Sequence, residues 1–318
     1  MTGGTGFIGS HLVEYLLAKN IEVYALVRNL KNVKFLKGLN IHFLHGDLFS
    51  IPPLPSDLQY VFHLAGLTKA LKLVDYYTVN HLGTASLFKS LRQQRIFPKV
   101  IYLSSLAAAG PSLGTRGRKE SDPPRPVTPY GKSKLKGEEE TLRQKNEFPL
   151  VILRVGAVIG PRDRDFLVYL KFAKRGILTS FGFKQRYLSI CFVKDLVRAL
   201  YQTAVTETDN GDIFNIGDPT PYTYEDIGLT AGKILGKKLR HVRIPLQMTF
   251  LWAAASDAYS FLTKRPSIVN TYKYIEMTQP GWVTDVSKAR EKLSFETRYS
   301  LEEALKEIIR WYIEKGWL

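Results

Sequence analysis

Tyr130 and Lys134 are the residues of this chain whose types and spacing could most directly do chemistry. Four positions apart, they would lie on one face of a helix, one turn from each other. A free phenol keeps its proton up to a pH of about 10, and a nearby ammonium lowers that pKa by favouring the phenolate. Such a tyrosine can exchange a proton with an alcohol or carbonyl near neutral pH. The same spacing is common on solvated helix faces, so its meaning depends on the residues around it.

Three glycines near the N-terminus, Gly3, Gly6 and Gly9, have the spacing of a dinucleotide-binding loop. A helical apolar pattern begins directly after them, and a strand-like run follows at 21–27. Glycines that open a helix let the backbone approach a pyrophosphate, which the N–H groups of the helix N-terminus then bind. The sequence therefore predicts the second half of a nucleotide-binding β-α-β unit.

The strand that should precede this loop is nearly absent, because only Met1 and Thr2 stand before the glycines. In a doubly wound sheet that strand is central, and its neighbours would lose a ladder partner. We expect the native chain to begin upstream of Met1. The alternative is a true start at Met1 with a weakened cofactor site, and the intact mass of the native protein distinguishes the two.

The second strand ends at Arg28, with no acidic residue beside it. An Asp or Glu there would bond the adenine ribose hydroxyls and select NAD, whereas an Arg suits the 2′-phosphate of NADP. Lys31 and Lys34 add positive charge. The position favours NADP as the cofactor, with NAD as the alternative; ordinary solvated bases are the other interpretation.

Several further motifs occur in a fixed order along nearly the whole chain. Together they resemble the extended short-chain dehydrogenases/reductases, of the NAD-dependent epimerase/dehydratase and dihydroflavonol-reductase type. The motifs are the glycine loop at 2–9, Gly46-Asp47-Leu48, 62–66, 79–84, 102–105, 130–134, Leu153-Arg154, 160–163 and 285–290.

The resemblance implies that Ser105, Tyr130 and Lys134 are the catalytic residues. Tyr130 would be the general acid/base, Lys134 would polarise it and bond the nicotinamide ribose, and Ser105 would hold the substrate oxygen. Asn80 has a second interpretation, as a structural residue beside the site. The cofactor-binding residues implied are Gly3, Gly6, Phe7, Ile8, Gly9, Arg28, Asp47, Leu48, Ala65, Gly66, Asn80, Tyr130, Lys134 and Val155.

The chain departs from the family pattern near the expected nicotinamide pocket. Val155 follows Arg154 where proline is usual, and Ile159 replaces a tyrosine. These changes bear on the substrate more than on the cofactor. Dehydratase members place an acid directly after the catalytic hydroxyl, where this chain has Leu-Ala-Ala-Ala at 106–109. A dehydratase needs a carboxyl group to help eliminate water, so dehydration is not expected.

Composition indicates a globular enzyme rather than a nucleic-acid-binding protein. The 318 residues are 45% hydrophobic, enough for a large core. The net charge of +16 is scattered, without a zinc or RNA-binding signature, so no nucleic-acid partner is expected. Six dispersed histidines predict no metal site, and the single cysteine, Cys191, excludes an intramolecular disulfide framework.

No segment is expected to cross a membrane. The longest apolar helix candidate, 246–262, is about 17 residues long and contains Asp257. It suits a buried helix or an apolar wall of the substrate site, with a membrane-surface role as the lesser alternative. The glycine loop stands where a signal peptide would, which favours a cytoplasmic location.

Strands and helices alternate up to about residue 154, which predicts an α/β fold with a doubly wound parallel sheet of the Rossmann type. We assign 1–154 to a dinucleotide-binding domain and 155–318 to a smaller, mainly substrate-binding portion, some elements of which return to the sheet. The first part has strands near 21–27, 41–44, 59–64, 98–104 and 149–154, and helices near 7–19, 72–95 and 130–145.

Within the first part, a proline-containing stretch at 110–129 is expected to be a long loop beside the site. The second part, 155–318, has a looser pattern of strands and helices. Expected there are helices near 165–175, 193–206, 222–235, 246–263, 285–293 and 300–316, and strands near 213–216 and 239–243.

These observations predict an oxidoreductase that moves a hydride between NADP and a secondary alcohol or ketone of unknown identity. The alternative is an NAD-dependent nucleotide-sugar epimerase that keeps its cofactor bound, and a third is a non-catalytic dinucleotide-binding protein. The expected partners are a small-molecule substrate and a second copy of the chain. The homodimer would form through the helices near 72–95 and 130–145.

Overall fold

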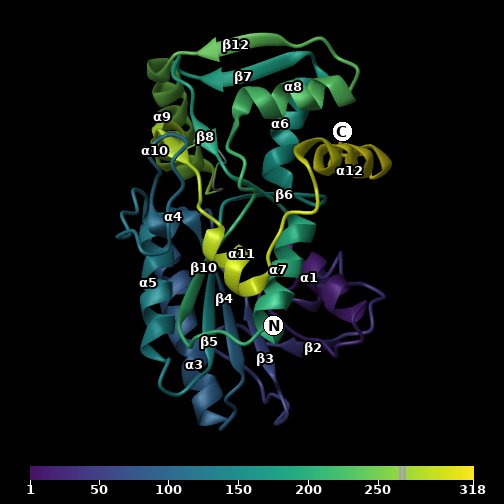
Figure 1. Ribbon diagram of the computed structural model, residues 1–318, viewed down its shortest axis with the longest axis vertical. Helices are drawn as coiled ribbons and strands as arrows, with labels where there is room; N and C mark the ends of the chain where they lie inside the picture. The colour runs from purple at the N-terminus through teal and green to yellow at the C-terminus, as the bar shows by residue number, and fades with distance from the viewer. Residues whose placement is uncertain (265–266, 268–269) are drawn as a thin grey trace.

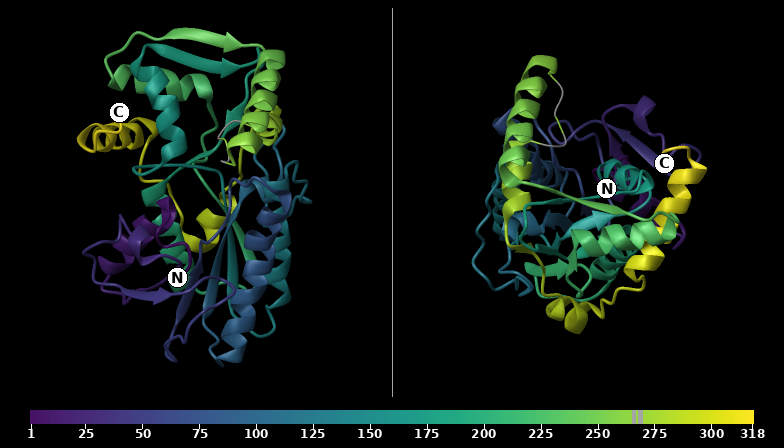
Figure 2. Two further views of the ribbon diagram at one scale, coloured as in Figure 1. Left: turned by 180° about the vertical axis from the view of Figure 1, so that it is seen from behind. Right: turned by 90° about the horizontal axis from the view of Figure 1, so that it is seen from above.

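A computed structural model describes residues 1–264, 267 and 270–318. The molecule is elongated, with a parallel sheet and its flanking helices in one half and several small sheets with further helices in the other (Figure 1). Seen from behind, the N-terminal elements lie beside the large sheet, while β7 and β12 lie at the far end (Figure 2).

The main sheet is built from parallel strands, which confirms the predicted α/β doubly wound class. Strand β5 is buried at every position, as expected for a strand covered on both faces. In spatial order the strands among the described residues are β2 (His42–His45), β1 (Tyr24–Val27), β3 (Tyr60–His63), β4 (Lys99–Ser105), β5 (Leu150–Val155) and β10 (Asp212–Ile216).

Met1 and Thr2 stand in the place of the expected first strand, between β1 and β3. The Thr2 N–H donates to the carbonyl of Phe62 at 3.0 Å, and the N–H of Leu26 donates to the carbonyl of Met1 at 3.0 Å. Beyond this contact a cavity of about 360 Å³ separates β1 from β3. The ladder between these strands is therefore kept only at the end next to the glycine loop.

Two helical layers cover the sheet. On one face, α1 (Phe7–Leu17) and α7 (Val193–Val205) bury leucines against β4 and β5. On the other face, α3 (Gly83–Gln93) buries leucines against the sheet, and α5 (Pro129–Arg143) lies beside it. Complete burial of one such side chain contributes roughly 1.5–3 kcal/mol. These two cores fix the carboxyl edge of the sheet, where the predicted site residues are.

The single helix expected near 72–95 is divided into three parts. It consists of α2 (Leu73–Tyr77), a π-helical turn η2 (Thr78–Leu82) and α3. A π turn inserts one extra residue and often lies at a functional site. Here it contains Asn80, whose side chain is buried toward the predicted site.

The second half carries short strands that the sequence pattern did not indicate. Strand β8 (Tyr187–Leu188) lies between β11 (Tyr222–Thr223) and β13 (Gly281–Trp282), and β6 (Ala157–Ile159) pairs with β9 (Ile190–Phe192). At the far end β7 (Ile177–Phe181), also not predicted, pairs in parallel with β12 (Arg240–Ile244), as Figure 1 shows; β12 is the strand that was predicted near 239–243. The two- and three-residue strands have no alternation to detect, which explains why β6, β8, β9, β11 and β13 were not predicted.

The helices expected in this half are present. An additional helix, α10, was not predicted; it has no fully buried residue and thus no clear apolar stripe. The helices are α6 (Arg164–Lys174), α8 (Tyr224–Ile234), α9 (Leu246–Thr263), α10 (Thr271–Thr278), α11 (Ser287–Leu293) and α12 (Leu301–Glu314), with α4 (Leu106–Ala109) and the short η1 (Leu30–Asn32) in the first half.

Helix α9 forms over the range expected, but its large apolar side chains are exposed to solvent instead of buried. The part of the chain that the structure describes contains no helix long and apolar enough to cross a membrane.

The predicted long loop at 110–129 is attached to the second half. The N–H of Ser112 donates to Gly281 at 2.9 Å, and the N–H of Arg118 donates to Val283 at 2.9 Å. The loop therefore connects β4 to β13. The division of the chain at residue 154 stays a prediction.

Candidate active site

The N-terminus of α5 positions the tyrosine. Thr128 caps the helix, its side chain accepting from the N–H of Gly131 at 3.2 Å, and Pro129 occupies the first helical position. Tyr130 follows in the first turn, at the carboxyl edge of the sheet. Its ring lies 6.3 Å from that of Tyr76, centroid to centroid.

Ser105 and Tyr130 come together, as the sequence predicted. Ser105 ends β4 and caps α4, its hydroxyl accepting from the N–H of Ala107 at 3.1 Å. Burial raises the pKa of Tyr130 to about 12, while a hydrogen bond with the Ser105 hydroxyl acts in the opposite direction. The hydroxyl of Tyr130 is thus a proton donor in this environment, and its conversion to a base requires further stabilisation of the phenolate.

Lys134 lies one turn below Tyr130 and is buried. Its ammonium donates to the carbonyl of Leu103 at 2.8 Å and lies 4.1 Å from the ring centroid of Tyr102. Burial lowers the pKa of Lys134 to about 7, and the Glu138 carboxylate acts against that fall. The predicted lowering of the phenol pKa by this ammonium is wrong for this structure, because burial of Tyr130 raises that pKa instead.

Glu138 extends the same helix face by another turn and was missed by the sequence analysis. Its carboxylate pairs with Arg154 of β5 at 2.7 Å, with both side chains buried, and accepts from the Ser104 hydroxyl of β4 at 2.5 Å. One carboxylate therefore ties α5 to both central strands. The spacing Tyr130, Lys134, Glu138 was the signal that could have revealed it.

The glycine loop has the close approaches that its spacing predicted. Gly3 has φ of +74°, and a Cβ there would lie 2.7 Å from the backbone nitrogen of Ala65. A Cβ on Gly9 would lie 2.2 Å from the carbonyl oxygen of Gly3. Helix α1 then begins at Phe7, after Gly6, without a side-chain cap. Its first N–H groups, including those of Phe7 and Ile8, are those that a pyrophosphate would meet.

A buried polar chain fixes Ala65, at the end of β3. The Thr2 hydroxyl accepts from the N–H of Ala65 at 3.1 Å and lies 2.7 Å from His63 Nδ1. The other nitrogen of His63 lies 3.0 Å from the Thr84 hydroxyl. Burial lowers the pKa of His63 to about 3, so this histidine is a neutral structural residue.

Asn80 holds the loop that follows Ala65. Its carboxamide oxygen accepts from the N–H of Leu67 at 2.8 Å, and its nitrogen donates to Leu67 and to Ser133 of α5. A Cβ on Gly66 would lie 3.2 Å from that oxygen. The amide of Asn80 is thus engaged by the protein, which supports the structural interpretation over direct contact with a cofactor.

The residues expected around the adenosine lie at the ends of β1 and β2. Arg28 directly follows β1 and is exposed. Asp47 follows β2, and its carboxylate accepts from the N–H groups of Phe49 and Ser50 at 2.8 and 3.0 Å. Leu48 is buried. A Cβ on Gly83 of α3 would collide with Leu48 at 2.6 Å, so the two residues pack closely.

A cavity of about 400 Å³ lies over Ser105 and Tyr130. Val155, at the end of β5, also lines it, and the second half supplies aromatic and apolar residues such as Tyr224 and Trp282. The cations lining it are paired: Lys69 lies 2.5 Å from Asp165, and Lys273 lies 3.0 Å from Glu276. The cavity therefore has a mixed lining of apolar, aromatic and hydroxyl side chains, including the Ser105 and Tyr130 hydroxyls, and little uncompensated charge.

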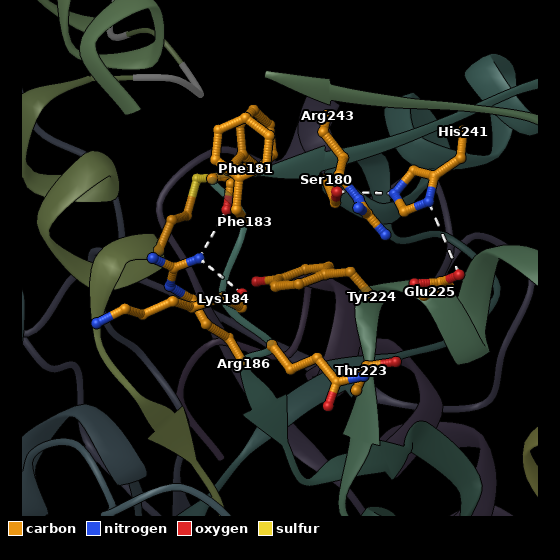
Figure 3. A pocket seen from close by; sticks show the side chains of 13 residues that line it. Ser180, Phe181, Phe183, Lys184, Arg186, Thr223, Tyr224, Glu225, His241 and Arg243 are labelled. Carbon is orange, nitrogen blue, oxygen red and sulfur yellow. Dashed lines mark hydrogen bonds and ion pairs between the residues drawn. The ribbon is translucent and has the colours of Figure 1, made fainter. Parts of the chain in front are cut away.

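A smaller pocket adjoins this cavity and shares Tyr224 and Met277 with it. Figure 3 shows Arg243, Arg186 and Lys184 around it, with Glu225 at one side. The guanidinium of Arg186 donates to the carbonyls of Phe181 and Lys184, at 2.6 and 3.2 Å. Cations outnumber carboxylates here, so this pocket is electropositive.

Comparisons with known proteins agree with this geometry. The sequence model of the NAD dependent epimerase/dehydratase family matches residues 1–217. The ceramide reductase of Caulobacter vibrioides is 27% identical over 323 residues, covering 100% of this chain and 95% of that protein. A putative dihydroflavonol 4-reductase of Synechocystis is 27% identical over 341 residues, covering 100% and 95%.

Solved structures of similar fold include nucleotide-sugar enzymes. The UDP-glucuronic acid 4-epimerase of Bacillus cereus in complex with NAD is 25% identical, with a TM-score of 0.78 over 100% of this chain and 98% of that one. The UDP-glucose 4-epimerase of Thermotoga maritima, 22% identical with a TM-score of 0.78 over 99% and 98%, shares the fold. This chain belongs to the NAD dependent epimerase/dehydratase family and is an NAD(P)-dependent enzyme of the oxidoreductase or epimerase kind.

Proposed function

We propose that this enzyme transfers a hydride between NADP and a neutral, largely apolar ketone or secondary alcohol. The observation that carries the proposal is the cavity over Ser105 and Tyr130, whose lining cations are each paired with a carboxylate. A carbonyl oxygen in it can reach both hydroxyls, while a strongly charged substrate would find little uncompensated charge to bind it.

The geometry supports the following catalytic roles. The Ser105 and Tyr130 hydroxyls would hold the carbonyl oxygen, and Tyr130 would give its proton to that oxygen as it becomes an alkoxide. Lys134 would stabilise the resulting phenolate through its positive charge and would bond the ribose of the dinucleotide. The dinucleotide, when bound, supplies or accepts the hydride.

The preference for NADP is supported by the end of β1. Arg28 is exposed there, and Lys31 follows in η1. A guanidinium can bind the 2′-phosphate by paired hydrogen bonds. We expect a higher kcat/KM with NADPH than with NADH, and Arg28→Asp should reverse that order. A clear NADH preference of the native enzyme would contradict the NADP assignment and leave the reductase proposal intact.

The substrate class is tested by following the oxidation of NADPH with long-chain, sterol-like and flavonoid-like ketones, and with nucleotide sugars as the competing class. The reductases among the relatives support the ketones. Turnover of an apolar ketone, absent in Tyr130→Phe, is the expected result. Conversion of nucleotide sugars alone would overturn the proposal.

A nucleotide-sugar epimerase is the second candidate, because the electropositive pocket of Figure 3 could hold a diphosphate. The similarity of this chain to the UDP-glucuronic acid 4-epimerase of Bacillus cereus also supports this candidate. An epimerase would purify with tightly bound NAD and would lose nucleotide-sugar binding in Arg243→Ala. Exchangeable NADPH and an unaffected Arg243→Ala variant would exclude it.

We also propose a homodimer in which α2, α3 and α5 pack against their copies. Exposed Leu73 and Val74 of α2 and Leu82 of η2 support this surface. Sedimentation velocity measures the assembly, and Val74→Asp should weaken it. A cytoplasmic location is supported by the free, buried Cys191, which fits a reducing compartment.

A further inference from the structure

Helix α9 has an inverted distribution of side chains. The positions that face the protein carry small or polar residues, and Thr249, Ala253 and Ser260 are buried. The large apolar residues point outward and are exposed; they are Met248 (61%), Phe250 (47%), Leu251 (66%), Trp252 (49%), Tyr259 (67%), Phe261 (83%) and Leu262 (78%). A helix of a water-soluble protein normally shows the opposite arrangement.

Two polar side chains of α9 contact the segment that follows it. The carboxylate of Asp257, the one acidic residue in this helix, accepts from the N–H of Thr271 at the start of α10. The Ser256 hydroxyl lies 2.6 Å from that of Ser267. These contacts fix the orientation of α9, and they therefore determine that its apolar face is the exposed one. Helix α9 itself lies at one side of the molecule in both views of Figure 2.

Basic residues stand at both ends of this face. At the N-terminal end Arg243, on β12, is exposed and leads through Pro245 directly into α9. The loop after β7 packs there too: a Cβ on Gly182 would lie 3.0 Å from Leu246, and that loop exposes Phe183 and Lys184. At the C-terminal end Lys264 is exposed in the left-handed conformation.

We propose that the outward face of α9, with Phe183 beside it, binds in the surface layer of an anionic lipid bilayer. Leu and Phe side chains would enter the acyl boundary, Trp252 and Tyr259 suit the headgroup level, and the flanking bases would meet lipid phosphates. The helix lies in the plane of the surface; it does not cross the membrane.

Charge favours a bilayer over a second copy of the chain. A two-fold contact through this face would bring the bases at the ends of α9 close to those of its copy, on a protein with a net charge of +16. An anionic surface neutralises the same bases. The face is also continuous with the substrate side, because Phe250 packs on Tyr274 of α10 at 5.4 Å, and α10 lines the cavity.

The direct test is flotation of the full chain with vesicles of phosphatidylcholine alone and with added phosphatidylglycerol. We expect strong binding only with phosphatidylglycerol, weakened by salt. The variant Leu251→Ser/Phe261→Ser/Leu262→Ser should bind at least tenfold less. The matched control is Leu229→Ser/Ile313→Ser, which changes exposed apolar residues of α8 and α12 and should bind like the native chain.

A conservative variant gives a second readout that does not depend on the stability of the triple variant. Brominated lipids should quench part of the tryptophan fluorescence, and Trp252→Phe should remove that part. Trp282, Trp311 and Trp317 then remain as the unquenched background. Equal quenching in the native protein and Trp252→Phe would overturn the proposal.

Two other results would overturn it as well. One is failure of the native chain to float with phosphatidylglycerol vesicles at low salt. The other is a native dimer that the triple variant converts to a monomer, which would show that a second copy covers the face. None of these measurements uses turnover, so they are independent of the proposed reductase function.

Discussion

Helices α5 and α9 are of similar length and use their two sides in opposite ways. In α5 (15 residues) the inner side carries charge: Lys134 and Glu138 are buried, and each has a specific partner. In α9 (18 residues) the inner side is small and weakly polar, and the bulk of the apolar surface faces outward. The comparison teaches that composition alone does not indicate which face of a helix is buried.

The two arrangements have different energetic consequences. Buried charges are costly unless paired, so the contacts of Glu138 with Arg154 and Ser104 favour one position of α5 against β4 and β5. An exposed apolar face costs little locally but favours association with a surface that removes it from water. We therefore assign precise positioning of the chemistry to α5 and attachment to a lipid surface to α9.

The largest expected effect comes from the first turn of α5, which carries Tyr130. Tyr130→Phe should lower kcat by about 10²- to 10⁴-fold, because the proton donor to the substrate oxygen is lost. The measurement is steady-state reduction of the ketone identified in the screen. Tyr201→Phe, on α7 and remote from the cavity, is the control and should keep its activity. Full activity in Tyr130→Phe would show that the roles are wrongly assigned.

The inner side of α5 also predicts a large loss of stability. Glu138→Gln leaves the Arg154 guanidinium buried without its counter-charge and should cost about 3–5 kcal/mol in the free energy of unfolding. Glu139→Gln breaks the half-exposed pair with Lys136 on the same helix and should change that free energy by less than about 1 kcal/mol. Urea unfolding measures both. Equal effects would mean that the buried pair does not anchor α5.

Sequence reasoning reached those features of the site that depend on neighbouring residues. The strand ends, the glycine turn and the helix that places Tyr130 and Lys134 together are local, and the structure has all of them. Glu138 was within reach, since it continues the same face. It was missed because a glutamate on a helix is usually solvated.

Features that depend on distant segments were out of reach. The electrostatic balance of the cavity depends on Lys69 meeting Asp165, 96 positions away, and on α10, which has no apolar stripe. The apolar content of α9 predicted burial, whereas its small residues at 249, 253 and 260 already marked the side that packs closely. The spacing of small side chains along α9 was therefore a better indicator of its buried side than the hydrophobicity of its residues.

A smaller effect concerns pH. Burial lowers the pKa of Lys134 from its ordinary 10.5 to about 7. Between these values the unfolded chain binds the proton more strongly than the folded protein does, so this residue makes stability rise with pH across that window. Lys134→Met removes the titrating group. The native protein should therefore gain stability relative to Lys134→Met between about pH 7 and 9, as measured by urea unfolding at each pH. A difference independent of pH would contradict the lowered pKa of Lys134.

The smallest effect distinguishes positioning from plain stability. Thr128→Ala removes the cap of α5, and Ser300→Ala removes the equivalent cap of α12; each should cost about 1 kcal/mol in the free energy of unfolding. Only Thr128→Ala should also lower kcat, because the first turn of α5 carries Tyr130. Thermal unfolding and ketone reduction, measured on both variants, give the two quantities. If kcat falls equally in both variants, the start of α5 does not position Tyr130. The buried Glu138–Arg154 pair is then the only feature that assigns a positioning role to α5.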